Sequence, residues 1–228
     1  MSKYLKIFTG ISIFYLILLL TKQDALAWYF KPLLLPFLVL ETYKSNDFRT
    51  KNLLLSALFF SWIGDVVLMF ADKDELFFIL GLVSFLISHI LFILLFTKQN
   101  QTKANSNFFW IGFIFVILYL FEILHFLFPY LGGLKIPVTI YASTISIMLL
   151  MAIKGYFNWS KPDNLTILIG ALFFVSSDSI LAINKFYPEL ELPKSGFLIM
   201  ITYITAQFLI TKGILELNKK NNPFLKIS

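Results

Sequence analysis

Long apolar stretches alternate with short polar breaks along the whole chain. Most of the stretches reach the roughly 20 residues that an α-helix needs to span the hydrocarbon core of a bilayer. The pattern predicts helices over residues 4–20, 25–42, 51–71, 76–97, 108–128, 132–154, 164–183 and 195–213. The breaks are too short to separate domains, so we predict one all-α integral-membrane domain over residues 1–228, a polytopic bundle of eight transmembrane helices.

Composition supports a membrane protein and excludes several kinds of site. Charged residues make up 14% of the 228 residues, whereas a soluble domain carries about 25%. The chain has no cysteine, which excludes disulfides, thiolate metal sites and cysteine nucleophiles. The two histidines, His89 and His125, are too few for a zinc site, and we expect neither a metal nor any other cofactor. The net charge of +6 comes without a basic run or face, so we expect no nucleic-acid partner.

The basic residues predict how the chain is oriented. With eight spans, the two termini and the second, fourth and sixth loops share one side of the membrane, and that side holds 13 of the 19 basic residues. Cytoplasmic segments are enriched in Lys and Arg. We therefore predict that both termini are cytoplasmic. As a separate expectation, the protein lies in a bacterial inner membrane.

Two distant segments resemble each other. Residues 57–68 read ALFFSWIGDVVL and residues 171–181 read ALFFVSSDSIL. The segments lie four spans apart and would run in the same direction, so a 4+4 parallel internal repeat is one explanation. Chance similarity between Phe- and Leu-rich segments is the other. In transporters built from repeats, the site lies where the halves meet.

Each of these segments carries an aspartate inside a predicted span, Asp65 and Asp178. An ionised carboxylate is costly within the bilayer, so such residues are functional candidates. Both lie roughly 20 Å from the cytoplasmic end of their helix at 1.5 Å per residue, which predicts a site in the outer half of the bilayer. Two confined carboxylates can retain one proton while one group stays ionised, as acid/base hydrolysis requires. The alternative is a pair of polar residues that only hold helices together.

Further polar residues near the two aspartates are candidates for substrate binding. Ser61 and Ser177 allow close helix approach and supply hydroxyl groups. Lys31 is expected to bind a phosphate or pair with an aspartate, and the alternative is snorkelling to the interface. His89 lies in the middle of a span, where it would relay protons, orient an acid or serve as a hydrogen-bonded core residue.

The last candidates are Tyr141, Tyr203 and Gln207. Tyrosine is common in membrane spans, so the two tyrosines are weak signals alone. An amide in the middle of an apolar helix needs partners, which makes Gln207 the stronger signal. Glu122 and His125 form a Glu-x-x-His pair, but iron carboxylate proteins need two copies and further glutamates, so no metal site is predicted.

The motifs together resemble a known family, the YhhN-like membrane proteins, which include the lysoplasmalogenases. The resemblance covers nearly the whole chain and rests on KPLLLP (31–36), SALFFSWIGDVVLM (56–69), GLVSFLISH (81–89), PVTIYASTISIMLLMA (137–152), GALFFVSSDSILA (170–182) and YITAQFLI (203–210). The family is similar in having about eight spans. The resemblance implies cleavage of the vinyl ether bond of a lysoplasmalogen to a fatty aldehyde and a glycerophospho-alcohol, with Asp65 and Asp178 as catalytic residues. A lysophospholipid substrate and bilayer lipids would be the partners.

Two other functions fit the same intramembrane acids. A proton-coupled transporter or lipid flippase would use them as a proton relay. A lipid-binding or sensor protein would use them without any chemistry. The sequence does not predict the oligomeric state.

Overall fold

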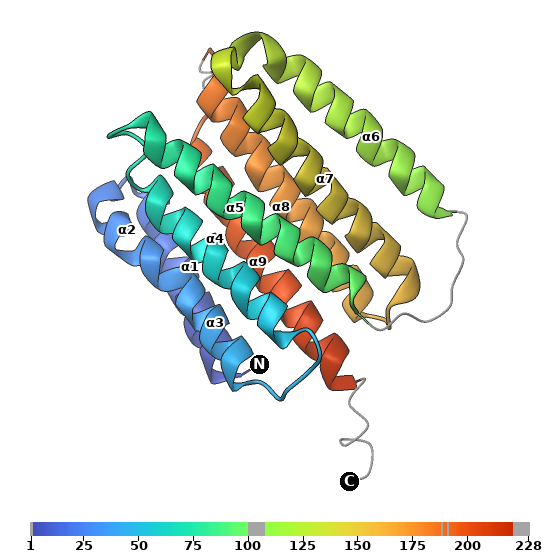
Figure 1. The fold of residues 1–228 in the computed structure, drawn as a ribbon. Helices are drawn as coiled ribbons and strands as arrows, with labels where there is room; N and C mark the ends of the chain where they lie inside the picture. The colour runs from blue at the N-terminus through green and yellow to red at the C-terminus, as the bar shows by residue number, and fades with distance from the viewer. Residues whose placement is uncertain (1, 100–107, 188, 191, 221–228) are drawn as a thin grey trace. The chain divides into compact units, whose positions relative to one another are not determined.

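The computed structural model describes residues 2–99, 108–187, 189–190 and 192–220. Its regular structure within these residues is entirely helical (Figure 1). The elements in chain order are α1 (Lys3–Leu20), α2 (Asp24–Phe30), η1 (Lys31–Leu33), α3 (Leu34–Lys44), α4 (Lys51–Leu68), α5 (Glu75–Thr97), α6 (Phe108–Leu127), η2 (Phe128–Tyr130), η3 (Gly132–Leu134), α7 (Lys135–Asn158), α8 (Asp163–Phe186) and α9 (Ser195–Lys220), where η marks a short 3-10 helix.

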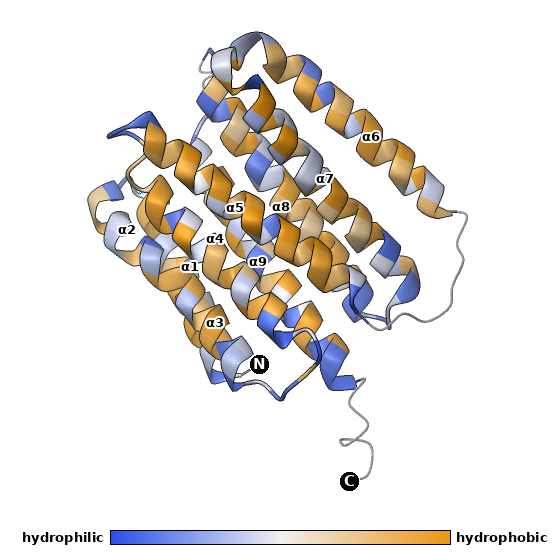
Figure 2. Ribbon diagram, in the orientation of Figure 1, coloured by the Kyte–Doolittle hydropathy of each residue, from blue (hydrophilic) through white to orange (hydrophobic). Residues whose placement is uncertain are grey.

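The prediction of eight membrane-spanning helices is confirmed. Within the described residues, eight segments are long and apolar enough to cross a membrane: Lys3–Leu20, Asp24–Lys44, Lys51–Leu68, Glu75–Thr97, Phe108–Tyr130, Gly132–Asn158, Asp163–Phe186 and Ser195–Lys220. In Figure 2, hydrophobic residues cover the helices and hydrophilic residues gather near their ends. This distribution is the reason that the helix boundaries could be predicted from the sequence.

The second and the last span each show a feature that the predicted bounds did not include. The second span is interrupted by a 3-10 turn at Lys31–Leu33, so Lys31 lies inside the span that begins at Asp24. The last helix continues to Lys220 although its apolar signal ends near residue 213, because Leu, Glu and Lys are good helix formers and because Ile214 and Leu217 are fully buried. The internal repeat, the single domain and the cytoplasmic orientation stay predictions. Lys103 and Lys226, which entered the charge count, lie outside the described residues.

The chain forms two compact units. Unit 1 holds the described residues up to Leu95 together with those from Asn218, and unit 2 holds Phe96–Leu217. In unit 1, α3 packs against α1 and α4. In unit 2, α7 packs against both α6 and α8.

Small residues allow one helix pair in each unit to approach closely. A Cβ at Gly64 of α4 would lie 2.6 Å from the ring of Phe85 in α5. A Cβ at Gly170 of α8 would lie 2.8 Å from Ile210 of α9 and 3.0 Å from its backbone nitrogen. Both glycines therefore fix the distance between neighbouring helices, and both lie on the helices that carry the aspartates.

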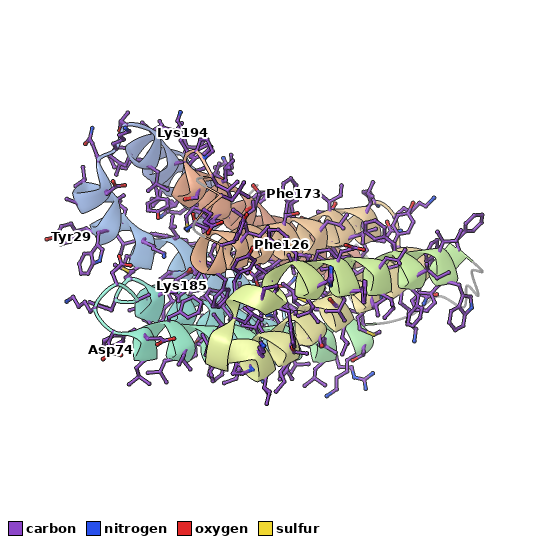
Figure 3. The ribbon with its side chains drawn as sticks, turned by 90° about the horizontal axis from the view of Figure 1, so that it is seen from above. Tyr29, Asp74, Phe126, Phe173, Lys185 and Lys194 are labelled. Atoms are coloured by element: carbon purple, nitrogen blue, oxygen red, sulfur yellow. The ribbon has the colours of Figure 1, made fainter. Side chains whose placement is uncertain are left out.

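The outward-facing surface of the helices is apolar, as expected of a protein in lipid. In unit 2, Phe126 of α6 is 41% exposed and Phe173 of α8 is 37% exposed, and Figure 3 labels both side chains. A soluble protein rarely exposes so many large apolar side chains. Polar side chains at mid-helix therefore stand out, and they define the candidate site.

Candidate functional site

Asp65 of α4 is buried, with 4% of its surface exposed. Its charge interacts with the ammonium group of Lys31 and with the phenol of Tyr15 on α1, which is also buried. Asp65 and Lys31 therefore interact electrostatically, and the roles predicted for Lys31 stay predictions. Tyr15 was missed, because a single tyrosine in a long apolar helix gives no distinctive signal.

Lys31 is half-buried and begins the 3-10 turn that interrupts the second span. The indole Nε1 of Trp62 on α4 donates a hydrogen bond to the backbone carbonyl of Pro32 at 2.8 Å. Helix α4 therefore contacts this turn through Trp62 and interacts with it electrostatically through Asp65. The sequence analysis did not select Trp62, although it lies in the quoted motif.

Ser61 lies in the contact between α4 and α5, and His89 lies on α5. The Ser61 and Ser88 hydroxyls are 2.7 Å apart, and Ser88 donates to the carbonyl of Ala57 at 2.9 Å. Because Ser88 has a single hydroxyl proton, Ser61 is the donor in their bond. Ser61 therefore has a packing role, and the neighbouring His89 is fully buried in α5. Their roles in substrate binding stay predictions.

Asp178 of α8 is half-buried and interacts with phenol groups from α7 and α6. The Tyr141 hydroxyl on α7 donates to its Oδ2 at 2.5 Å. Tyr119 on α6 interacts electrostatically with Asp178 and lies 2.7 Å from the Ser179 hydroxyl. Ser179 donates to the carbonyl of Val175 at 2.6 Å, so Tyr119 donates to Ser179. Tyr119 was missed for the same reason as Tyr15.

The remaining candidates, Ser177, Tyr203 and Gln207, lie on α8 and α9. The Ser177 hydroxyl donates to the carbonyl of Ile199 at 3.0 Å. The Tyr203 ring packs edge-on against Phe174, with centroids 5.6 Å apart. Gln207 is fully buried one turn further along α9. Ser177 and Tyr203 therefore connect α8 with α9, and the binding roles of all three residues stay predictions.

No metal site emerges from the described residues. A group of three or more His, Asp or Glu side chains that could hold a metal is not found among them. Glu122 and His125 are exposed on α6, where His125 stacks on Phe121 with ring centroids 5.9 Å apart. These neighbours give the Glu-x-x-His pair no additional ligand.

The site residues thus form two clusters, one in each unit. The first combines a buried carboxyl group with an ammonium group that interacts with it electrostatically, and this combination can bind an anion near an acid or base. The second places a carboxyl group next to phenol hydroxyls, which can hold a carboxylate in a fixed orientation. Either cluster offers acid/base chemistry inside an apolar environment.

Comparisons with known proteins agree with the resemblance noted in the sequence. The chain is 31% identical over 178 residues to the Homo sapiens protein named lysoplasmalogenase TMEM86A, and 29% identical over 166 residues to its Bos taurus counterpart. Each alignment covers 70% of this chain but only 63% of the relative's length. No solved structure matches. The family model described as the YhhN family matches residues 26–214, and the chain therefore belongs to the YhhN family.

Proposed function

We propose that this protein is a membrane-embedded hydrolase that cleaves the vinyl ether bond of lysoplasmalogen-type lysophospholipids. The observation that carries the proposal is the buried Asp65, which interacts electrostatically with Lys31, in a family member similar to proteins named lysoplasmalogenase. The substrate has an acid-labile bond and a phosphate in one small molecule. An acid group and a cation next to each other, within an apolar helix layer, match both features.

The chemistry needs an acid, a stabilising anion and a water. Protonation of the vinyl ether at carbon gives an oxocarbenium ion, which captures water. The resulting hemiacetal loses a proton and collapses to a fatty aldehyde and a glycerophospho-alcohol, so the acid is regenerated. We assign these tasks to Asp65 and Asp178, one as the acid and the other as the anion that stabilises the cation or activates water, as in glycoside hydrolysis.

The other residues are proposed to hold the lysophospholipid. Lys31 would bind the phosphate, and Tyr141 would orient the Asp178 carboxylate that its hydroxyl contacts. The alkenyl chain would lie among apolar side chains. The further substrate-binding residues in this proposal are Ser61, His89, Ser177, Tyr203 and Gln207. We also propose that the site lies in the outer half of a bacterial inner membrane, with both termini cytoplasmic.

The test is to incubate purified protein with alkenyl- and acyl-lysophospholipids and to assay the release of aldehyde. We expect aldehyde only from the alkenyl substrate, and no turnover with Asp65→Asn or Asp178→Asn. Asp74→Asn is the matched control, because Asp74 is exposed (Figure 3) and caps the backbone N–H of Leu76, a task that Asn performs equally. Full activity of both site variants would contradict the proposal.

A proton-coupled transporter is the second candidate. The break at Lys31–Leu33 inside a span favours it, because transporters bind substrates at interrupted helices. Proteoliposomes separate the two functions. Movement of a lysophospholipid across the bilayer without aldehyde formation would favour the transporter over the hydrolase.

A further inference from the structure

The interruption of the second span follows from its own sequence. Pro36 has no backbone N–H, so the carbonyl of Pro32, four residues earlier, has no donor in a regular helix. The structure shows the consequence as a 3-10 turn at Lys31–Leu33, after which α3 begins at Leu34. An unsatisfied backbone carbonyl is costly inside a bilayer, where no water replaces the missing donor.

Trp62 supplies the donor that Pro36 lacks. Its indole nitrogen lies 2.8 Å from the Pro32 carbonyl oxygen, and an indole N–H can only donate. Trp62 and Asp65 are three residues apart on α4 and therefore neighbours on its surface. The indole thus fixes the carbonyl next to Lys31, while Asp65 interacts with the Lys31 ammonium group.

We propose that Trp62 is a positioning residue that holds the turn so that Lys31 can bind the phosphate of a lysophospholipid beside Asp65. The inference rests on the phosphate-binding role proposed for Lys31. It adds that this role depends on one hydrogen bond to the backbone, made by a side chain that does not touch the substrate. The aromatic body of Trp62 packs on Phe59, with centroids 6.0 Å apart, so Trp62→Phe removes the donor while it keeps an aromatic ring.

Binding of two non-cleavable ligands to the full-length protein in detergent tests the proposal. One is a 1-O-alkyl lysophosphatidylcholine, whose saturated ether has no double bond to protonate, and the other is the phosphate-free 1-O-alkylglycerol. For Trp62→Phe we expect roughly three- to tenfold weaker binding of the phosphate ligand, the size of one hydrogen bond, with unchanged binding of the alkylglycerol. Equal losses for both ligands, or no loss, would overturn the proposal.

Two controls make the result specific. Trp110→Phe makes the same change at an indole that is 62% exposed on α6, and we expect no change in either affinity. In a Pro36→Ala background, residue 36 regains its N–H, so the additional effect of Trp62→Phe should shrink. An undiminished effect in that background would mean that the indole does not act through the Pro32 carbonyl, and would contradict the inference.

A further variant covers the possibility that Trp62→Phe does not fold. Lys31→Met should lose the preference for the phosphate ligand while it binds alkylglycerol normally, and a retained preference would overturn the inference. The binding assay also separates this inference from the proposed function. A protein that cleaves no vinyl ether but shows the Trp62-dependent preference would refute only the hydrolase. A protein that cleaves it while Trp62→Phe binds both ligands normally would refute only the role of Trp62.

Discussion

Asp65 and Asp178 lie in segments of similar sequence but in different surroundings. Asp65 is buried and interacts with the ammonium group of Lys31 at a helix break. Asp178 is half-buried, and its carboxylate accepts a hydrogen bond from Tyr141. The difference arises because neither partner belongs to the similar segments themselves. Lys31 lies in the second span and Tyr141 on α7, so the chemistry of each aspartate is set by the helices that pack against it.

Substitution of the aspartates should have the largest effect on aldehyde release. It tests whether catalysis needs both clusters. We expect Asp65→Asn and Asp178→Asn each to lower aldehyde release by at least roughly a hundredfold, since general acid/base catalysis typically contributes about 10² to 10⁴. Steady-state turnover of an alkenyl-lysophospholipid by folded, monodisperse protein is the measurement. Loss of activity in only one variant would mean that a single cluster carries the chemistry.

Substitutions at Gly64 and Gly170 compare the helix contacts made by α4 and α8, the two helices that carry the aspartates. Gly64→Ala and Gly170→Ala should each destabilise the protein by about 1–3 kcal/mol, because overpacking forces neighbouring atoms to move. Gly170→Ala should cost more, since its Cβ would meet the backbone of Ile210 as well as a side chain. Thermal unfolding in detergent measures this.

Gly10→Ala is the control for both glycine variants. A Cβ at Gly10 meets nothing within 4 Å, so in this helix the change should be neutral or stabilising by up to about 1 kcal/mol. A larger loss for Gly64→Ala than for Gly170→Ala would show that the α4–α5 contact is the more rigid one.

The first cluster contains a cation, Lys31, whose proposed role is to bind the phosphate of the substrate. We expect Lys31→Met to raise KM for a phosphate-bearing substrate by roughly tenfold, as the loss of one charge-assisted hydrogen bond predicts. The effect on a phosphate-free alkenylglycerol should be smaller. Lys185→Met, which removes an exposed lysine near the end of α8, serves as the control. The same loss for both substrates would assign Lys31 to the support of Asp65 rather than to the phosphate.

The smallest effect should come from the phenol beside Asp178. Tyr141→Phe removes the hydroxyl that donates to Oδ2, and we expect turnover to fall roughly three- to tenfold, with little change in KM, since one hydrogen bond to the carboxylate is lost. Tyr43→Phe on α3, where the tyrosine is 62% exposed, is the matched control. An unchanged turnover would show that Asp178 is oriented without Tyr141.

The helices were predictable from the sequence, and the partners of the aspartates were predictable only in part. Apolar stretches of about 20 residues predicted all eight spans, because a helix of this length is needed to cross the bilayer and its residues must be mostly apolar. Lys31 was a visible candidate because a lysine in an apolar stretch is rare. Tyr15, Tyr119 and Trp62 were not, since aromatic residues are common in such helices and their polar atoms matter only once a neighbour lies within hydrogen-bonding distance.

The sequence by itself determined that this chain spans a membrane with eight helices and carries one aspartate inside the third span and another inside the seventh. It also determined the break in the second span, because Pro36 lacks an N–H whatever packs around it. Only the tertiary structure decided that Trp62 replaces that donor, that Asp65 meets a cation and that Asp178 meets a phenol. Local covalent chemistry determines where a helix can form and where it must break. Side-chain partners come from other helices, and their identity depends on packing that no local pattern records.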